Sequence, residues 1–130
     1  MNSQLGLLHD IGSPSVLAGT RLADAFRYWQ GRSGRQYLFR IASIGDLTET
    51  YDHVVIVARK GEDGRRQAVW IGIGGTLDAF AEIEAALAAG GCELHIHALA
   101  ETMAARGAVI DDLRAAGVPV PDTQFLLAAA

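Results

Sequence analysis

The fold is decided by residues 53–73, which read HVVIVARKGEDGRRQAVWIGI. Two β-rich runs, His53–Lys60 and Arg65–Ile73, flank the turn Gly61–Gly64. The first run is almost continuously apolar and β-branched, which is typical of a strand covered on both faces. A tight turn between two such runs predicts an antiparallel hairpin.

A helix, a strand and a second helix are predicted after this hairpin. Thr76 is a suitable N-cap for a helix that ends at Gly90-Gly91, and Thr102 is the expected cap of the last helix. The run Glu93–Leu99 alternates polar and apolar residues, which predicts a half-exposed strand. The predicted inner sides of the two helices carry Leu77, Phe80, Ile83 and Leu87, and Met103, Arg106, Ile110 and Leu113, respectively.

The stretch before residue 53 predicts one more hairpin, formed by Phe26–Gln30 and Arg35–Ser43. Residues 1–15 lack periodicity, so we expect a loop or a loosely packed arm there. Thr20 can cap a short helix that continues to Ala25.

The composition fits one globular domain of the α+β class, because half of the 130 residues are hydrophobic and a fifth are charged. The predicted architecture is a mostly antiparallel sheet flanked by helices. We divide residues 1–130 into an N-terminal arm with a short helix (1–24), a hairpin (25–44), a core (53–117) and an extended apolar tail (118–130).

Several features bear on location. No apolar run approaches the roughly 18 residues of a membrane span, and the first residues lack the pattern of a signal peptide. Cys92 is the only cysteine and cannot form an internal disulfide, so the cytoplasm is the expected location, without membrane contact. For the apolar tail, packing on the domain, contact with a partner and use as a degradation tag all stay open.

A series of short motifs occurs in a characteristic order along the chain. They are Trp29, Gly31, Ser33-Gly34 and Tyr37, then Asp63-Gly64, Trp70-Ile71-Gly72, His95-Ile96-His97 and Asp112-Leu113. In this order they resemble the GIY-YIG nuclease-like superfamily, and more narrowly small bacterial proteins that place an aromatic-Gly-Ser-Gly-Tyr hairpin before that domain. The resemblance implies a GIY-YIG-like core of antiparallel hairpin, helix, strand and helix.

The resemblance also implies where nuclease chemistry would lie. Its two tyrosine positions fall near Val55 and on Trp70, its arginine position on Phe80 and its metal-binding glutamate position on Ile110. None of these residues can hold a metal or stabilise a phosphoryl transition state. We expect Val55, Phe80 and Ile110 to fill the former pocket with packed core, which predicts no catalytic residue. A shift of one residue in the alignment would bring Asp111 or Asp112 near the metal position.

Arginines are concentrated in the first hairpin, although the whole chain has a formal net charge of −4. Arg27, Arg32, Arg35 and Arg40 are therefore candidates for binding nucleic acid. The alternative is a solvated sheet edge, on which arginines alternate without a shared ligand.

Glu93, His95 and His97 are candidate metal ligands, because they share one face of a predicted strand at two-residue spacing. The alternative is that they are ordinary polar residues on a half-exposed strand. We expect no cofactor.

These observations lead to an expected function. It is a non-catalytic GIY-YIG-like interaction domain, protein-binding or self-associating, with a protein partner or a homo-oligomer. The alternative is a non-cleaving nucleic-acid-binding remnant that uses the basic hairpin, with weak binding to nucleic acid. A metal-dependent nuclease is the third hypothesis.

Overall fold

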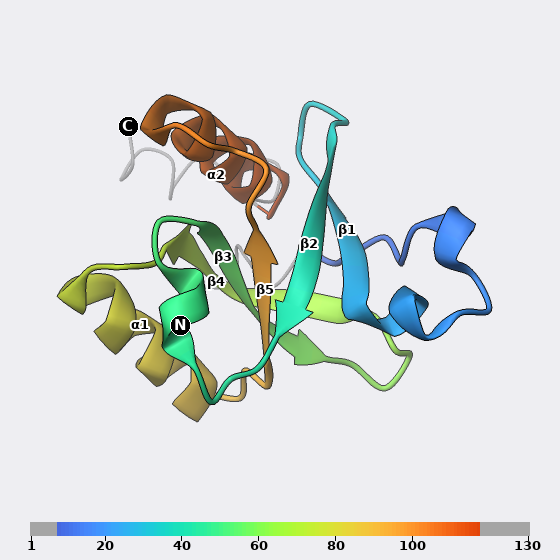
Figure 1. The fold of residues 1–130 in the computed structure, drawn as a ribbon, viewed down its shortest axis with the longest axis horizontal. Helices are drawn as coiled ribbons and strands as arrows, with labels where there is room; N and C mark the ends of the chain where they lie inside the picture. The colour runs from blue at the N-terminus through green and yellow to red at the C-terminus, as the bar shows by residue number, and fades with distance from the viewer. Residues whose placement is uncertain (1–7, 118–130) are drawn as a thin grey trace, which may run out of the picture.

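Residues 8–117 are described by a computed structural model, in which a curled five-stranded sheet carries one helix on each face (Figure 1). The strand order is β1-β2-β5-β3-β4, and all neighbouring strands are antiparallel. The predicted α+β class and the mostly antiparallel sheet flanked by helices are confirmed. The strands are β1 (Phe26–Gln30), β2 (Gln36–Ala42), β3 (Val54–Lys60), β4 (Arg66–Ile73) and β5 (Glu93–His97), and the helices are α1 (Leu77–Ala88) and α2 (Met103–Gly117).

Strand β5 lies between the two predicted hairpins and forms the centre of the sheet. It pairs with β2, where Ile96 is opposite Arg40, and with β3, where His95 is opposite Ile56. His95 is fully buried and His97 is 5% exposed. The prediction of a half-exposed strand is therefore wrong, because both faces of a central strand are covered here by other layers.

Two apolar cores occupy the two faces of the sheet. Burial of apolar surface is the main favourable contribution to folding, at about 25 cal/mol per Å². The core beneath α2 includes Trp29, Phe39, Val54, Ile56, Ile71, Val109, Ile110 and Leu113. The core beneath α1 includes Val55, Val57, Ile83, Ala86 and Leu94. Successive residues of β3 alternate between the cores, as expected for a strand covered on both sides.

Helix α1 begins as predicted, because Thr76 Oγ1 accepts the backbone N–H of Ala79 at 3.0 Å. Its buried side is formed by Ala79, Ile83 and Ala86. Leu77 and Phe80 were predicted to face inward but are 87% and 47% exposed. The small side chains at the buried positions place the helix close to the sheet and turn the larger residues outward.

Helix α2 also has its predicted cap, since Thr102 Oγ1 accepts the N–H of Ala105 at 3.0 Å. Ile110 and Leu113 are buried as expected, but Met103 is 69% exposed. Arg106 turns toward the start of the helix, where its Nε donates to the carbonyl of Ala100 at 3.1 Å. The inner stripe of α2 therefore begins one turn later than predicted.

Residues 8–12 of the N-terminal arm bridge the two edge strands. Ala68 of β4 donates its N–H to the carbonyl of Leu8, and Ile11 donates to the carbonyl of Tyr28 in β1, both at 2.9 Å. Leu8 is 4% exposed. Of the two predictions for residues 1–15, the loop fits residues 8–12, which have only isolated bridges, and the loosely packed arm is wrong for them, because their backbone covers edges that would otherwise be unpaired.

The remaining segments are short. They include three 3₁₀ turns, which are η2 (Ser15–Leu17), η3 (Arg21–Ala25) and η4 (Leu47–Thr50). Thr20 does not cap η3 through its side chain, because its hydroxyl donates to the carbonyl of Leu17 at 2.7 Å. The predicted tail, 118–130, and the first seven residues lie outside the described residues. Within residues 8–117 no helix is long and apolar enough to cross a membrane.

Candidate functional site

The tip of the β1–β2 hairpin is tied to α2 by the carboxylate of Asp112. Its Oδ1 accepts the backbone N–H of Ser33 at 2.8 Å, and its Oδ2 accepts the hydroxyls of Ser33 at 2.6 Å and Tyr37 at 2.7 Å. A Cβ at Gly31 would collide with this carboxylate, so glycine is required there. We call Asp112, Ser33 and Tyr37 the hairpin latch, and it accounts for the spaced Gly, Ser and Tyr of this hairpin.

The latch shifts the pKa values of both of its titratable groups. Burial alone would raise the pKa of Asp112, but hydrogen bonds from Ser33 and Tyr37 favour the ionised carboxylate and lower the pKa overall. Burial, the hydrogen bond to Asp112 and its charge raise the pKa of Tyr37. The carboxylate is therefore ionised and the phenol protonated at neutral pH, so neither is poised to transfer protons near pH 7.

A buried polar chain of Trp29, His95, Glu93 and Arg66 connects β1, β5 and β4. Trp29 Nε1 donates to His95 Nδ1 at 3.0 Å, which leaves the imidazole proton on Nε2, 2.9 Å from Glu93 Oε1. Glu93 also accepts Arg66 Nε at 3.0 Å and Nη2 at 3.3 Å. Both nitrogens of His95 are thus bonded to protein groups.

Hydrogen bonds and burial set the protonation states of Glu93 and His95 in this buried polar chain. The hydrogen bond from His95 and the guanidinium of Arg66 lower the pKa of Glu93 to about 2, against the opposing effect of burial. Burial lowers the pKa of His95, although Glu93 acts in the opposite direction. A neutral imidazole next to an ionised carboxylate is therefore the state at neutral pH.

The geometry gives no support to a metal site at Glu93, His95 and His97. His97 Nδ1 lies 2.8 Å from a backbone carbonyl of β2, and its ring contacts Tyr37 and Phe39 at centroid distances of 5.8 and 5.2 Å. Across residues 8–117, no three side chains of His, Cys, Asp or Glu are grouped to hold a metal ion. The two histidines share a face, as predicted, but use it to bond and pack within the domain.

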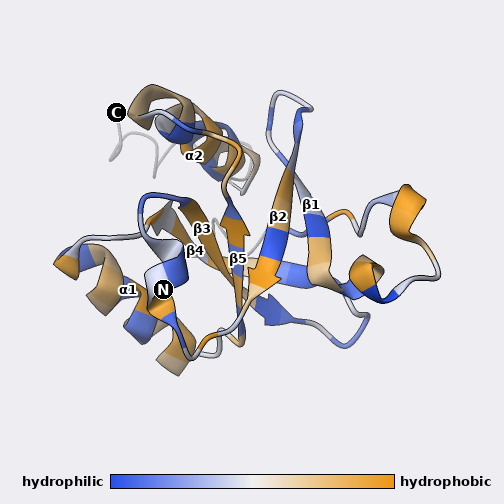
Figure 2. Cartoon of the chain, in the orientation of Figure 1, coloured by the Kyte–Doolittle hydropathy of each residue, from blue (hydrophilic) through white to orange (hydrophobic). Residues whose placement is uncertain are grey.

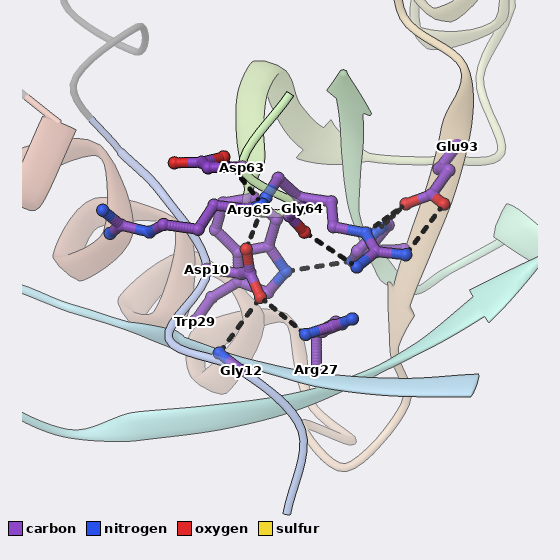
Figure 3. A network of polar contacts seen from close by, with 10 residues as sticks. Asp10, Gly12, Arg27, Trp29, Asp63, Gly64, Arg65 and Glu93 are labelled. Atoms are coloured by element: carbon purple, nitrogen blue, oxygen red, sulfur yellow. Dashed lines mark hydrogen bonds and ion pairs between the residues drawn. The ribbon is translucent and has the colours of Figure 1, made fainter. Parts of the chain in front are cut away.

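A pocket of about 470 Å³ lies where the N-terminal arm crosses the β3–β4 turn (Figure 3). We call it the arm–turn pocket, and it is lined by Asp10, Ile11, Gly12, Arg27, Asp63, Gly64 and Arg65. Gly12 and Gly64 have φ angles of 101° and 83°, which favour glycine where the backbone reverses.

Asp10 anchors this pocket and is 1% exposed. Its carboxylate accepts the backbone N–H groups of Arg66 and Gly12, the second at 3.0 Å, and it lies 3.4 Å from Arg27 Nη1 (Figure 3). Among the described residues, Arg27 Nε is buried without a hydrogen-bond partner. An unsatisfied buried donor costs about 1–3 kcal/mol.

The four arginines predicted to bind nucleic acid do not share one face. Residues opposite each other in an antiparallel pair point to the same side. Arg27, opposite Phe39, therefore lies on the α2 side, whereas Arg40, opposite Ile96, lies on the α1 side. Arg40 is also paired with Glu49 at 3.1 Å.

Arg32 and Arg35 are the two predicted arginines that the structure brings together, at the exposed tip of the first hairpin. The basic face expected from four arginines is thus reduced to two neighbouring cations. Their backbones flank Ser33, which the hairpin latch holds in place.

The positions implied by the nuclease resemblance do not converge. Val55 is buried beneath α1 and Ile110 is buried beneath α2, on the opposite face of the sheet. Phe80 is 47% exposed, and Trp70 Nε1 donates to Glu82 of α1 at 2.9 Å. The expectation that three replaced residues fill one former pocket is therefore wrong.

Arg27 is the one lining residue of the arm–turn pocket that was predicted to bind a ligand, and the charged residues Asp10 and Arg65 are among those that were not. Asp10 precedes a glycine by two residues, a pattern typical of a turn and found equally at surface loops. Arg65 follows the turn Asp63-Gly64, and Asp63 Oδ1 accepts its backbone N–H at 2.9 Å. Nothing in the local pattern indicates that the arm meets this turn.

A small lobe of residues 13–25 lies beside β1 and contains η2 and η3 (Figure 1). Neither turn contains a buried residue. Val16 is 84% exposed and Leu22 is 54% exposed, and hydrophobic colour marks both turns in Figure 2. We call residues 13–25 the N-terminal lobe.

Comparison of the chain with protein-family models, with curated proteins and with solved structures found no match. The resemblance to the GIY-YIG nuclease-like superfamily accordingly stays a prediction. Functional proposals for the chain rest on its own residues.

Proposed function

We propose that the chain is a non-catalytic interaction domain that self-associates through its N-terminal lobe. The observation that carries the proposal is the exposure of Val16 and Leu22 on two adjacent turns that bury no residue of their own. In the single chain these two apolar side chains remain exposed to water and add little buried surface to the fold. Exposed apolar groups gathered on adjacent elements are typical of protein contacts.

Other large apolar side chains are also exposed, and the two on α1 differ from those of the lobe in one respect. Leu77 and Phe80 belong to α1, which buries Ile83 in the core beneath it. The helix therefore contributes to folding even though its outer residues meet water, and isolated exposed apolar residues are ordinary. The two turns of the N-terminal lobe bury no residue, and the buried Pro14 of the lobe lies outside both turns.

Strand addition is a less favourable mode of association for this sheet. The N-terminal arm bonds to both edge strands, and Arg114 Nη2 donates to the carbonyl of Ile71 in β4 at 2.6 Å. Covered edges resist pairing with another chain. Contacts between side chains of two lobes, related by a two-fold axis, are the simpler arrangement.

The proposal is for a non-catalytic domain because the polar residues of the motifs bond to other groups of the domain. The hairpin latch occupies Asp112, and the buried polar chain occupies His95 and Glu93. The proposal includes a GIY-YIG-like frame and a bacterial, cytoplasmic setting, as the resemblance and the single Cys92 imply.

Sedimentation equilibrium of the full chain tests the proposal. Two apolar residues make a small interface, so we expect a reversible dimer with a dissociation constant of roughly 10–100 µM. Val16→Asp/Leu22→Asp should weaken it at least about tenfold, because charges would be buried. Leu77→Asp is the matched control, since Leu77 is 87% exposed and lies outside the lobe.

Two outcomes would contradict the proposal. One is a monomer at all concentrations up to about 1 mM, well above the expected dissociation constant. The other is equal weakening by Leu77→Asp, which would place the interface on α1.

A second candidate function is supported by one observation, the exposure of Arg32 and Arg35 together at a hairpin tip. Two cations could make weak, non-specific contacts to the phosphates of a nucleic acid. The other two predicted arginines are engaged with Asp10 and Glu49. Binding that is strong at physiological salt is therefore not expected from this surface.

A further inference from the structure

The two arginines of the arm–turn pocket offer more hydrogen-bond donors than the two carboxylates of the pocket can accept. Both of its carboxylates are already bonded to backbone N–H groups, Asp10 to those of Arg66 and Gly12, and Asp63 to that of Arg65. Their remaining capacity is small compared with the ten N–H groups that two guanidinium groups offer.

Arg27 is the fixed cation of the pocket. Its side chain is only 16% exposed, and its single ion pair, to Asp10 Oδ2, is long at 3.4 Å. Its Nε is buried without an acceptor. Buried donors are nearly always satisfied in folded proteins, so the Arg27 guanidinium is held at the pocket with a donor that no acceptor of the described residues uses.

Arg65 is the second cation that lines the pocket, and it is exposed. Within residues 8–117 its guanidinium takes part in no ion pair. In Figure 3 the side chains of Arg65 and Arg27 extend to opposite sides of Asp10, so the pocket is lined by one mostly buried and one exposed guanidinium.

We infer that the arm–turn pocket binds an organic carboxylate. A planar carboxylate matches the two parallel N–H groups of a guanidinium, which makes the pair charge-assisted and often bidentate. The carboxylates of Asp10 and Asp63 line the same pocket and repel a phosphate dianion more strongly than a monoanion.

The size of the pocket indicates more than a bare carboxylate. A volume of about 470 Å³ lies in the range of small-ligand sites. Ile11 lines the pocket and is 43% exposed, which provides an apolar contact for a hydrocarbon segment. The ligand class is therefore a carboxylate on a short carbon chain. This chemistry is found in free short-chain monocarboxylic acids and in acidic side chains of peptides.

This inference does not depend on self-association, because the pocket residues differ from Val16 and Leu22. Isothermal titration calorimetry of the full chain with butyrate tests the free acid, and the capped peptide acetyl-Ala-Glu-Ala-amide tests the peptide source. The tighter of the two ligands identifies the source. Inorganic phosphate is the comparison anion, which should bind more weakly than either.

Variants locate the binding. Arg65→Gln should weaken binding at least about tenfold, and Arg27→Lys should do the same because lysine keeps the charge but loses the planar fork. Arg32→Gln is the matched control, since it removes one exposed cation outside the pocket and should leave binding unchanged. The melting temperature of each variant shows that it is folded.

The inference is overturned if neither carboxylate shows saturable binding up to about 10 mM, a concentration above that of most specific small-ligand sites. It is also overturned if Arg32→Gln weakens binding as much as Arg65→Gln, which would indicate general attraction of anions. Tighter binding of phosphate than of both carboxylates would overturn the assigned ligand class.

Discussion

Replacement of Asp112 by alanine is expected to loosen the first hairpin from α2. The variant loses three hydrogen bonds, from the N–H and hydroxyl of Ser33 and from the hydroxyl of Tyr37. A hydrogen bond contributes about 1 kcal/mol net, and Ser33 at the exposed tip can bond to water instead, so we expect a loss of about 2–3 kcal/mol. For a domain of this size that corresponds to a fall in melting temperature of roughly 8–12 °C.

Asp111→Ala is the matched control, because Asp111 is the exposed neighbour on the same helix. It removes the same charge and gives the same gain in helix propensity, so the difference between the two variants isolates the latch. Thermal unfolding followed by circular dichroism measures both. Equal melting temperatures for Asp112→Ala and Asp111→Ala would refute the structural role of the latch.

The same carboxylate predicts a pH dependence. The folded-state pKa of Asp112 is lowered, so its contribution to stability is complete above the unfolded pKa of about 4 and is lost as the pH falls through the folded value. The destabilisation by Asp112→Ala should therefore shrink in acid. A difference between the variants that is constant from pH 7 to about pH 2 would contradict this linkage.

Three further results are expected. The free energy of unfolding should decrease as the pH falls below about 6.5, because burial lowers the pKa of His95 in the folded state and the unfolded state therefore binds its proton first. His95→Gln should reduce this pH dependence, as measured by urea unfolding at several pH values. An unchanged pH dependence would show that it comes from other groups. Trp70→Ala should lower the free energy of unfolding by about 2–3 kcal/mol, which is less than for a fully buried tryptophan, because the ring is partly exposed over Gly72. A decrease above about 4 kcal/mol would show that the ring is more deeply buried. Any DNA binding should have a log–log salt slope of about −2, which Arg32→Ala/Arg35→Ala removes; a slope near −4 would require the two paired arginines as well.

The sequence predicted the elements of this fold well, because their signals are local. Thr76 and Thr102 cap the helices through their side chains, as their positions before the helical patterns indicate. The hairpin at residues 53–73 follows from a β-branched run on each side of a glycine-containing turn.

The environment of the histidines could not be predicted in the same way. The alternating pattern that contains His95 and His97 is the same for a half-exposed strand and for a central strand whose polar residues have buried partners. The partner of His95 is Trp29, which is 66 residues away along the chain. Only the insertion of β5 between the two hairpins brings them together.

The candidate pocket depends even more on distant contacts. Asp10 and Arg65 line it because the N-terminal arm crosses the β3–β4 turn, and neither segment carries a local signal for the other. Arg27 was predicted for its charge, and its buried, unpartnered Nε became apparent only from the packing around it.

The most direct test of self-association is a concentration series of ¹H–¹⁵N correlation spectra of the full chain. Self-association through the N-terminal lobe predicts chemical-shift changes between about 20 µM and 1 mM protein, a range that spans the expected dissociation constant. These changes should be concentrated in residues 13–25, with those of Val16 and Leu22 among the largest. Spectra that do not change with concentration, or changes centred on α1 around Leu77, would contradict an interface formed by the N-terminal lobe.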